Sequence, residues 1–329
     1  PAGGSLYRYK TYTEKGETRE VALLQPNVNP YTDKFSGMSN EGQTRRLTSL
    51  ARKVITPSTV WIVAPETALA PLWENDSLRL DKALQPLDSL VKEHPQAAIM
   101  AGAITQRMVK EGEPLSYTAR PGESGGHYEV FNSALFISHA GTVQLGHKSI
   151  LVSGVEKMPF QQYFSFLGNY VIDAGGMSGS LSAANEPTVF KGQKGEGIGS
   201  VICFESVFAP YVASTIRKGA QVLFVITNDG WWKTSSGIRQ HFDYSRLRAI
   251  ETRRSIARSA NTGISGFINQ RGEVIQQTSV NTTTAIRAPL HLNDHLTFFV
   301  RHGNYLGNMS IAMVLLMLIY FIIKRESFK

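Results

Sequence analysis

The stretch Gly197–Ser206, GIGSVICFES, is an apolar run that ends at Cys203 and Glu205. A short apolar run without alternation is typical of a strand that is buried on both faces, as in the parallel sheets of α/β proteins. The carboxyl ends of such strands face the crevice where ligands bind. Cys203 is the only cysteine among 329 residues, so it has no intrachain disulfide partner. This position favours a nucleophile, although a packed core thiol is the alternative, because free cysteine is among the most buried residue types.

Apolar runs alternate with helical periodicities along the rest of the chain. The runs predict strands at 20–28, 59–67, 97–105, 129–138, 143–148, 197–205, 220–229 and 284–292, and a hairpin at 264–278. The periodicities predict helices at 40–54, 77–93, 209–218 and 237–259, and Pro86 is a candidate position for a kink or break in the second. We therefore expect an α/β fold, with helices outside and mixed sheets inside.

The composition is that of a globular protein with a sizeable core, since 42% of the residues are apolar and 18% are charged. The formal net charge of +8 is compatible with nucleic acid, an anionic membrane surface or acidic substrates. No RNP motif, zinc-finger spacing or uninterrupted basic helix is present, which disfavours nucleic acid as a partner. With one cysteine the sequence has no CxxC spacing of the kind that binds metal, and we expect no metal and no cofactor.

The segment Leu306–Ile323 contains no charged residue and is long enough to cross a membrane. Lys324, Arg325 and Lys329 follow it and favour a cytoplasmic C-terminus. The residues before Tyr305 are then expected on the opposite side of the membrane. A buried C-terminal helix is the alternative.

Residues 158–199 interrupt the alternation of strands and helices. This insertion is rich in glycine and serine and contains several aromatic residues, among them Phe160 and Phe164. Long irregular insertions are usually functional or disordered. The aromatic residues favour an ordered lid over a solvated linker.

Two further polar positions follow apolar strands. Glu66 comes just after the strand at 59–67, and Lys148 ends a predicted hairpin. A carboxylate behind so apolar a strand is costly unless it has a partner or a function. With Cys203 these residues supply a base, a cation and a nucleophile, in the chain order Glu, Lys, Cys.

This order resembles the nitrilase superfamily and, within it, the apolipoprotein N-acyltransferase family. The stretches that carry the resemblance are LLQPNV, WIVAPETALA, FNSALFI, HKSILVSGVEKMPF, ICFES, TNDGWW, QHFDYSRLRAIETRRSIARSANTGISGFINQRGEV and RHGNYLG. The chain departs from the family at SGVE, where Pro-Phe-Gly-Glu is usual, and at Phe204, where Tyr is frequent.

The resemblance implies a four-layer αββα sandwich followed by one C-terminal transmembrane helix. It implies a catalytic domain at residues 19–304, with the lid at 158–199, and a membrane helix with a short basic tail at 305–329. Residues 1–18 are then a linker from an upstream membrane region. The implied location is the bacterial inner membrane, with the catalytic domain on the periplasmic side.

The resemblance also implies the reaction, which transfers a fatty acyl chain from a phospholipid to the N-terminal amine of S-diacylglyceryl-cysteine apolipoproteins. Glu66 would act as general base, Lys148 would stabilise the oxyanion, and Cys203 would carry the acyl chain as a thioester. Glu156 and Glu205 are expected to support these three residues. Candidates for lining an acyl pocket, or for lying at the membrane interface, are Phe160, Phe164, Trp231 and Trp232.

Two alternatives stay open. A membrane-tethered amidase or carbamoylase of the same superfamily would use Glu66, Lys148 and Cys203 with water as the final acceptor. A binding module without catalysis is the other alternative, but it has no chemical reason to keep all three residues. His147, His241 and His302 have no serine or cysteine partner close in sequence, and we assign them no catalytic role.

Overall fold

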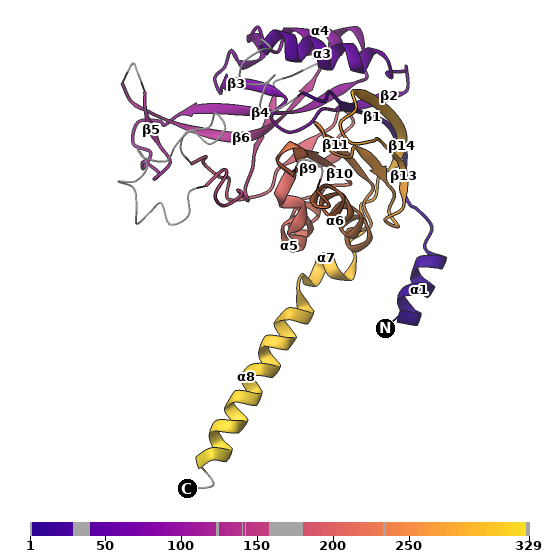
Figure 1. Ribbon diagram of the computed structural model, residues 1–329, viewed down its shortest axis with the longest axis vertical. Coiled ribbons are helices and arrows are strands. Elements are labelled where there is room, and N and C mark those ends of the chain that lie inside the picture. Colours follow the sequence, from indigo (N-terminus) through magenta and orange to yellow (C-terminus); the bar gives the residue numbers. More distant parts are fainter. Residues whose placement is uncertain are drawn as a thin grey trace.

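Two β-sheets lie between two layers of helices (Figure 1). The computed structural model describes residues 2–28, 40–122, 125–139, 141, 143–157, 180–232 and 235–326. Helices α3 (Asn40–Arg52) and α4 (Gln85–Glu93) cover the first sheet, and α5 (Ala209–Arg217) and α6 (Gly237–Thr252) cover the second. The predicted αββα sandwich is confirmed.

The first sheet has the strand order β14-β1-β2-β4-β6-β5, with β3 paired to β4 and β7 paired to β6. Its strands are β1 (Thr18–Gln25), β2 (Thr59–Val63), β3 (Leu69–Trp73), β4 (Ala98–Met108), β5 (Arg120–Pro121), β6 (His127–Ser138), β7 (Gln144–His147) and β14 (Thr284–His291). Strands β1, β2 and β4 are parallel. Their carboxyl ends therefore lie at one edge of the sheet.

The second sheet has the order β13-β12-β11-β10-β9-β8. Its strands are β8 (Val189–Lys191), β9 (Gly197–Ile202), β10 (Val222–Thr227), β11 (Ile256–Ala260), β12 (Gly266–Ile268) and β13 (Val274–Gln277). Strands β9, β10 and β11 are parallel. The end of β9 therefore carries Cys203 to the same edge as the polar residues that follow β10.

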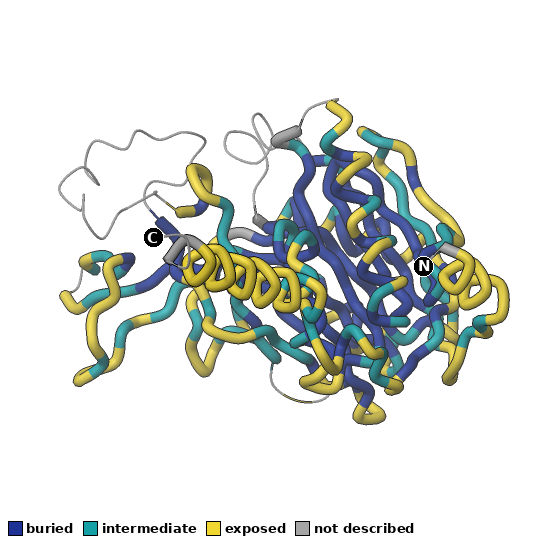
Figure 2. Tube along the Cα trace, turned by 90° about the horizontal axis from the view of Figure 1, so that it is seen from below, coloured by how far each residue is buried: buried dark blue, intermediate teal, exposed yellow. Residues whose placement is uncertain are grey.

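Apolar side chains fill three layers of core. In β10, Val222 and Phe224 pack between the sheets, whereas Leu223 and Val225 pack under α5 and α6. Figure 2 shows the buried strands at the centre of the sandwich. Burial on both faces explains why these strands are continuous apolar runs in the sequence.

The C-terminal helix α8 (Tyr305–Glu326) projects from the sandwich beyond the short helix α7 (Phe298–His302) (Figure 1). It is exposed along its length (Figure 2), and no part of its apolar window is buried. In the part of the chain that the structure describes, Tyr305–Lys324 is the single helix with the length and composition of a membrane span. The alternative of a buried core helix is therefore wrong.

Two predicted helices are too long. The helix expected at 237–259 ends at Thr252, because Arg253 adopts a left-handed φ of 53° and β11 follows. The helix expected at 77–93 divides into a 3₁₀ turn, η1 (Leu78–Leu80), and α4, which has Pro86 in its first turn. Proline is tolerated there because the first N–H groups of a helix have no intrahelical partner. Residues Ala2–Thr11, expected as a linker, form helix α1.

Candidate functional site

The predicted base and cation meet in the structure. Glu66 follows β2, and Lys148 follows β7 on the far side of β4 and β6. The Lys148 Nζ lies 3.0 Å from the Glu66 Oε1 and 2.8 Å from the Glu156 carboxylate. Lys148 is 1% exposed, so this ammonium group is shared by two buried carboxylates. Its hydrogen bonds to both hold it in one place.

Asn132 holds the same two carboxylates together. Its Nδ2 donates to the Glu66 Oε1 and to the Glu156 Oε1, each at 2.7 Å. Asn132 lies in β6, and its backbone carbonyl accepts from the Lys148 N–H at 2.8 Å. Sequence analysis missed this residue, because an asparagine within a strand gives no signal of what lies beside it across the sheet.

The electrostatics of the cluster keep Glu66 and Lys148 ionised. Burial alone would raise the pKa of Glu66, but Lys148, Asn132 and the Asn228 backbone N–H together lower it. Burial alone would lower the pKa of Lys148, but the charges of Glu66 and Glu156 raise it. An opposite charge at hydrogen-bond distance outweighs desolvation here. Glu66 is therefore a carboxylate near neutral pH and can accept a proton.

The loop that carries Glu66 lies very close to β4. A Cβ on Gly102 would lie 2.6 Å from the Glu66 Cα and 2.6 Å from the Thr67 N. Real Cβ atoms do not approach backbone so closely, so only glycine fits at position 102. Thr67 itself has a φ of 47°, which shows how sharply the chain turns after Glu66. Sequence analysis did not single out Gly102.

Cys203 begins the 3₁₀ helix η3 (Cys203–Val207) with a φ of 52°. A left-handed backbone is uncommon for a residue other than glycine and is often found at functional sites. The residue is half-buried. Burial and the charge of Glu66 raise the pKa of its thiol, while Lys148 lowers it. The resting residue is therefore a thiol that needs a base to become a nucleophile.

Glu205 joins the strand end that carries Lys148 to the turn that carries Cys203. One carboxylate oxygen accepts from the Ser149 N–H at 2.6 Å and the Ile150 N–H at 3.3 Å, and the other accepts from the Ile202 N–H at 2.7 Å. Glu205 is 1% exposed, and burial raises its pKa to about 7. Glu156 similarly accepts from the Val152 N–H at 2.9 Å.

A second buried polar cluster contacts the backbone of Cys203. The His241 Nε2 lies 3.1 Å from the Cys203 carbonyl oxygen, and the His241 Nδ1 lies 2.9 Å from the Asp229 Oδ1. The Arg258 Nη2 donates to the Asp229 Oδ2 at 3.0 Å. Sequence analysis assigned no role to His241 and did not consider Asp229 or Arg258. Their contacts depend on the packing of α6 against the second sheet.

The other candidates fall outside what the structure describes. Phe160 and Phe164 lie in the undescribed segment 158–179, and the side chains of Trp231 and Trp232 are also not described. The backbone of both tryptophans belongs to the 3₁₀ helix η4 (Asp229–Trp232). Their predicted contact with an acyl chain stays a prediction.

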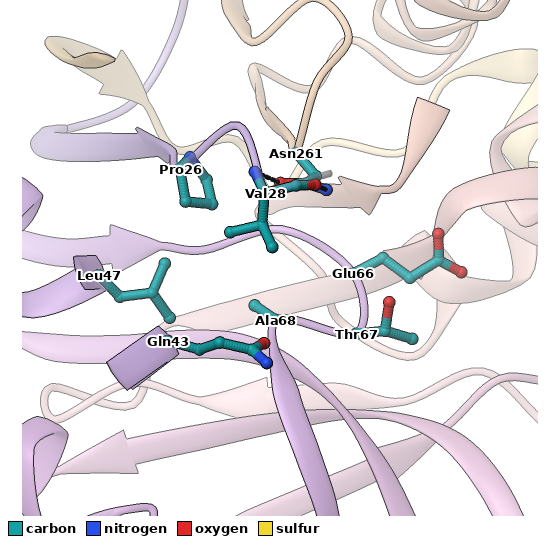
Figure 3. Close-up of a pocket in the computed structure, with 8 residues that line it drawn as sticks. All are labelled: Pro26, Val28, Gln43, Leu47, Glu66, Thr67, Ala68 and Asn261. Carbon is teal, nitrogen blue, oxygen red and sulfur yellow. Dashed lines mark hydrogen bonds between the residues drawn. The ribbon is translucent and has the colours of Figure 1, made fainter. Parts of the chain in front are cut away.

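A small pocket lies beside the stem of Glu66 (Figure 3). Its lining residues are Pro26, Val28, Gln43, Leu47, Glu66, Thr67, Ala68 and Asn261. The carboxylate of Glu66 points away from Leu47 and Gln43 in this view. The pocket therefore adjoins the loop that carries Glu66, and Lys148 is not among its lining residues.

Comparison with protein families gives one match that covers most of the chain. Residues 20–295 match the family model described as carbon–nitrogen hydrolase. Two solved structures share the fold. One is a Saccharomyces cerevisiae member of branch 10 of the nitrilase superfamily, with a TM-score of 0.60 and 15% identity over 85% of this chain and 93% of that chain. The other is an amidase from Nesterenkonia sp., with a TM-score of 0.57 and 12% identity over 90% of this chain and 97% of that chain.

Two curated relatives carry the same name. An apolipoprotein N-acyltransferase from Chlorobaculum tepidum is 30% identical over 89% of this chain and 55% of the relative. Another from Geobacter metallireducens is 29% identical over 91% of this chain and 53% of the relative. The chain thus spans about half the length of the curated relatives it matches.

Proposed function

Because the chain belongs to the carbon–nitrogen hydrolase family, we propose that it catalyses N-acyl transfer to apolipoproteins through an acyl-enzyme on Cys203. The observation that carries the proposal is the Lys148 ammonium group shared by Glu66 and Glu156, next to a half-buried cysteine with a left-handed backbone. The similarity to curated apolipoprotein N-acyltransferases supports the substrate class.

The first half of the reaction forms the thioester. Glu66 takes the proton of the Cys203 thiol, and the thiolate attacks the ester carbonyl of a phospholipid. Lys148 donates a hydrogen bond to the oxygen where negative charge develops, a contribution of about 3–4 kcal/mol for one such donor. The carbon–oxygen bond of the ester then breaks. The proton on Glu66 passes to the departing oxygen, and lysophospholipid leaves.

The second half moves the acyl chain to nitrogen. The N-terminal amine of an S-diacylglyceryl-cysteine protein attacks the thioester, and Glu66 takes a proton from the attacking nitrogen. The carbon–sulfur bond breaks, and the thiolate of Cys203 recovers that proton. An amide is the product. Lys148 stabilises the oxyanion in both halves, so one charge arrangement serves two acyl transfers.

The membrane setting follows from α8. An exposed apolar helix of this length supports insertion into a bilayer. Lys324 and the basic residues after it in the sequence support a cytoplasmic C-terminus. The domain at 19–304 then lies on the periplasmic face of the bacterial inner membrane, where phospholipid and lipoprotein are both within reach. The lid role of 158–199 is part of the same proposal.

The test is detection of the acyl-enzyme by intact-protein mass spectrometry. After incubation with phospholipid alone, the chain should gain the mass of one fatty acyl group, and hydroxylamine should remove it. A diacylglyceryl-cysteine peptide with a free amine should clear the adduct and yield an N-acyl peptide. The N-acetylated peptide is the matched control and should leave the adduct in place.

Two other outcomes would overturn the proposal. Rapid loss of the adduct in buffer, with release of free fatty acid, would favour the amidase-like hydrolase. Absence of any adduct, with Cys203 unmodified and reduced, would favour a binding module without catalysis.

A further inference from the structure

The carbonyl oxygen of Cys203 has two buried hydrogen-bond donors. The Ser206 Oγ donates to it at 2.7 Å, and the His241 Nε2 lies 3.1 Å from it. A carbonyl oxygen accepts and never donates, so the Nε2 carries the proton of its contact with Cys203. The same Nε2 also lies 3.1 Å from the Ser206 Oγ, whose lone pairs are free to accept while its own proton goes to the carbonyl. The two donors come from different elements, since Ser206 lies in η3 and His241 lies in α6.

His241 is held from its other side by charged groups. Its Nδ1 lies 2.9 Å from the Asp229 Oδ1 and 3.1 Å from the Arg258 Nη2. One is an acceptor and the other is a donor, so Nδ1 has a partner whether or not it is protonated. The orientation of the ring is thus set by groups on η4 and β11.

Asp229 is anchored in turn. Its carboxylate accepts from Arg258 and from the Thr227 Oγ1, and both Asp229 and Arg258 have side chains with 0% exposure. Burial alone would raise the pKa of Asp229, but Arg258 and His241 lower it to about 2. A Cβ on Gly263 would lie 2.1 Å from the Asp229 Oδ2, so the loop after β11 also confines this carboxylate.

We infer that His241 is a positioning residue for the nucleophile Cys203. His241 holds the Cys203 carbonyl in the orientation that the left-handed backbone of Cys203 requires. The inference rests on the proposed role of Cys203. The peptide unit is planar, so fixing the direction of the carbonyl fixes ψ of Cys203. Together with the φ of 52°, that angle sets the direction of the Cα–Cβ bond of Cys203, from which the thiol extends.

The two ring nitrogens can be tested separately by isosteric amides. In His241→Gln the side-chain amide nitrogen occupies the place of Nε2, so a donor to the Cys203 carbonyl remains. In His241→Asn it occupies the place of Nδ1, so a partner for Asp229 remains but the bond to Cys203 is lost. A role confined to packing or to Asp229 predicts that Asn substitutes for histidine at least as well as Gln.

The first readout is alkylation of the chain by iodoacetamide, which needs no acyl donor. Cys203 is the only cysteine, so incorporation reports on it alone. At pH 7 we expect His241→Asn to react about fivefold more slowly than the wild type, the factor that corresponds to the net contribution of one hydrogen bond. His241→Gln should lose less than about twofold by the same reasoning. The pH profile of alkylation should change in the Asn variant and not in the Gln variant.

The second readout is acyl transfer, in which kcat should fall in His241→Asn while KM stays within about twofold, because only the reacting geometry changes. His291→Gln is the control. That half-buried histidine also contacts a backbone carbonyl, through its Nδ1 at 3.0 Å from the Gly16 oxygen, and it pairs with Thr18 at the start of β1, the end opposite the site. It should leave both readouts unchanged.

If His241→Asn does not fold, Ser206→Ala provides a second test of the same inference. It removes the second donor to the same carbonyl, together with the 3.1 Å contact of Ser206 with the His241 Nε2, and leaves the pair of Asp229 and Arg258 intact. We expect slower alkylation with an unchanged melting temperature. Equal behaviour of the Asn and Gln variants, or no effect of Ser206→Ala, would overturn the inference. If alkylation follows the expected order but no acyl transfer occurs in the wild type, the proposed function fails and the positioning role stands.

Discussion

Two buried ionic clusters meet at Cys203, and they differ in what they contact. The first lies at the end of the first sheet and consists of Glu66, Lys148 and Glu156, so one cation is shared by two carboxylates. The second lies at the end of the second sheet and consists of Asp229, His241 and Arg258. In it one carboxylate is shared by an imidazole and a guanidinium group. The first cluster acts on the thiol through charge. The second contacts the backbone of the same residue.

The first cluster therefore bears on the chemistry at the thiol, and the second bears on the geometry of the Cys203 backbone. Buried charges are costly unless they are paired and hydrogen-bonded, and both clusters are. In the first cluster the pairing keeps the proposed base, Glu66, and the cation Lys148 ionised beside the proposed nucleophile. In the second the pairing orients an imidazole that holds a carbonyl. Removing a member of the first should therefore reduce turnover far more than it alters the position of Cys203.

The largest effect on acyl transfer should come from substitution of Cys203, the residue on which both clusters act. Cys203→Ala removes the proposed nucleophile and should abolish both the acyl adduct and acyl transfer. The fold should survive, because a small half-buried thiol contributes little packing. Circular dichroism and thermal unfolding check the fold, and mass spectrometry checks the adduct. Acyl transfer at the wild-type rate by the purified variant would eliminate Cys203 as nucleophile.

The next effect concerns the base in the first cluster. Glu66→Gln keeps the shape of the side chain but removes the proton acceptor, and acylation should slow by roughly 10²–10⁴-fold. Substrate binding should change little. Glu129→Gln is the matched control, because Glu129 is another buried carboxylate paired with a cation, 2.6 Å from the Arg107 Nη2. If Glu66→Gln keeps more than about half of the wild-type rate, its assignment as base is wrong.

Lys148→Met should slow acylation by about 10²–10³-fold, the usual loss for one oxyanion donor. It also leaves Glu66 and Glu156 buried without their cation, which typically costs about 3–5 kcal/mol of stability. The pH dependence of unfolding distinguishes this loss from simple loss of packing.

The sign of that pH dependence can be worked out. In the wild type the pKa of Glu66 is lowered by folding, so its contribution to stability is present above the unfolded pKa and is lost as pH falls. Without Lys148, burial raises the pKa of Glu66 above the unfolded value. The Lys148→Met variant should then lose stability as pH rises from the unfolded pKa of Glu66 to its higher pKa in the folded variant. Arg254→Met is the control, since Arg254 bonds backbone carbonyls and its loss unpairs no buried carboxylate. If the free energy of unfolding changes with pH in the same way in wild type and Lys148→Met, the stabilising role of Lys148 between Glu66 and Glu156 is contradicted.

How far the sequence predicts these regions depends on how local the signal is. The strands β9 and β10 were predicted correctly because burial on both faces leaves a continuous apolar run. The end of α6 was not, because Arg254 and Arg258 are buried in the structure, whereas arginine in a sequence suggests an exposed helix face. Buried arginines that bond carbonyls or a buried aspartate leave no periodic pattern.

The site shows the same division. Glu66, Lys148 and Cys203 each follow an apolar run, and this local context made them candidates before any contact was known. Asn132, Asp229 and His241 lie within or beside ordinary elements, and their partners are distant in sequence. Such contacts depend on sheet register and on the packing of α6, which a single sequence does not specify.

The smallest effect should come from the residue that connects the two sheets. Glu205 lies in η3, after the second sheet, and accepts from the Ser149 N–H, after the first. Burial raises its pKa to about 7, above the value of about 4.3 expected in the unfolded chain. Folding therefore favours the protonated form. The stability that Glu205 contributes is fully present below pH 4 or so and is lost as pH rises through about 7.

Glu205→Gln should remove this pH dependence, because the amide does not titrate. The difference in unfolding free energy between wild type and variant should shift by at most about 3 kcal/mol between pH 4 and pH 8, in favour of the variant as pH rises. Glu20→Gln is a control of opposite sign. Hydrogen bonds from Thr56 and Thr59 outweigh burial and lower the pKa of Glu20, so its contribution is lost as pH falls. A constant difference between wild type and Glu205→Gln across this range would mean that folding leaves the pKa of Glu205 unchanged, with the Ser149 and Ile202 N–H groups offsetting its burial.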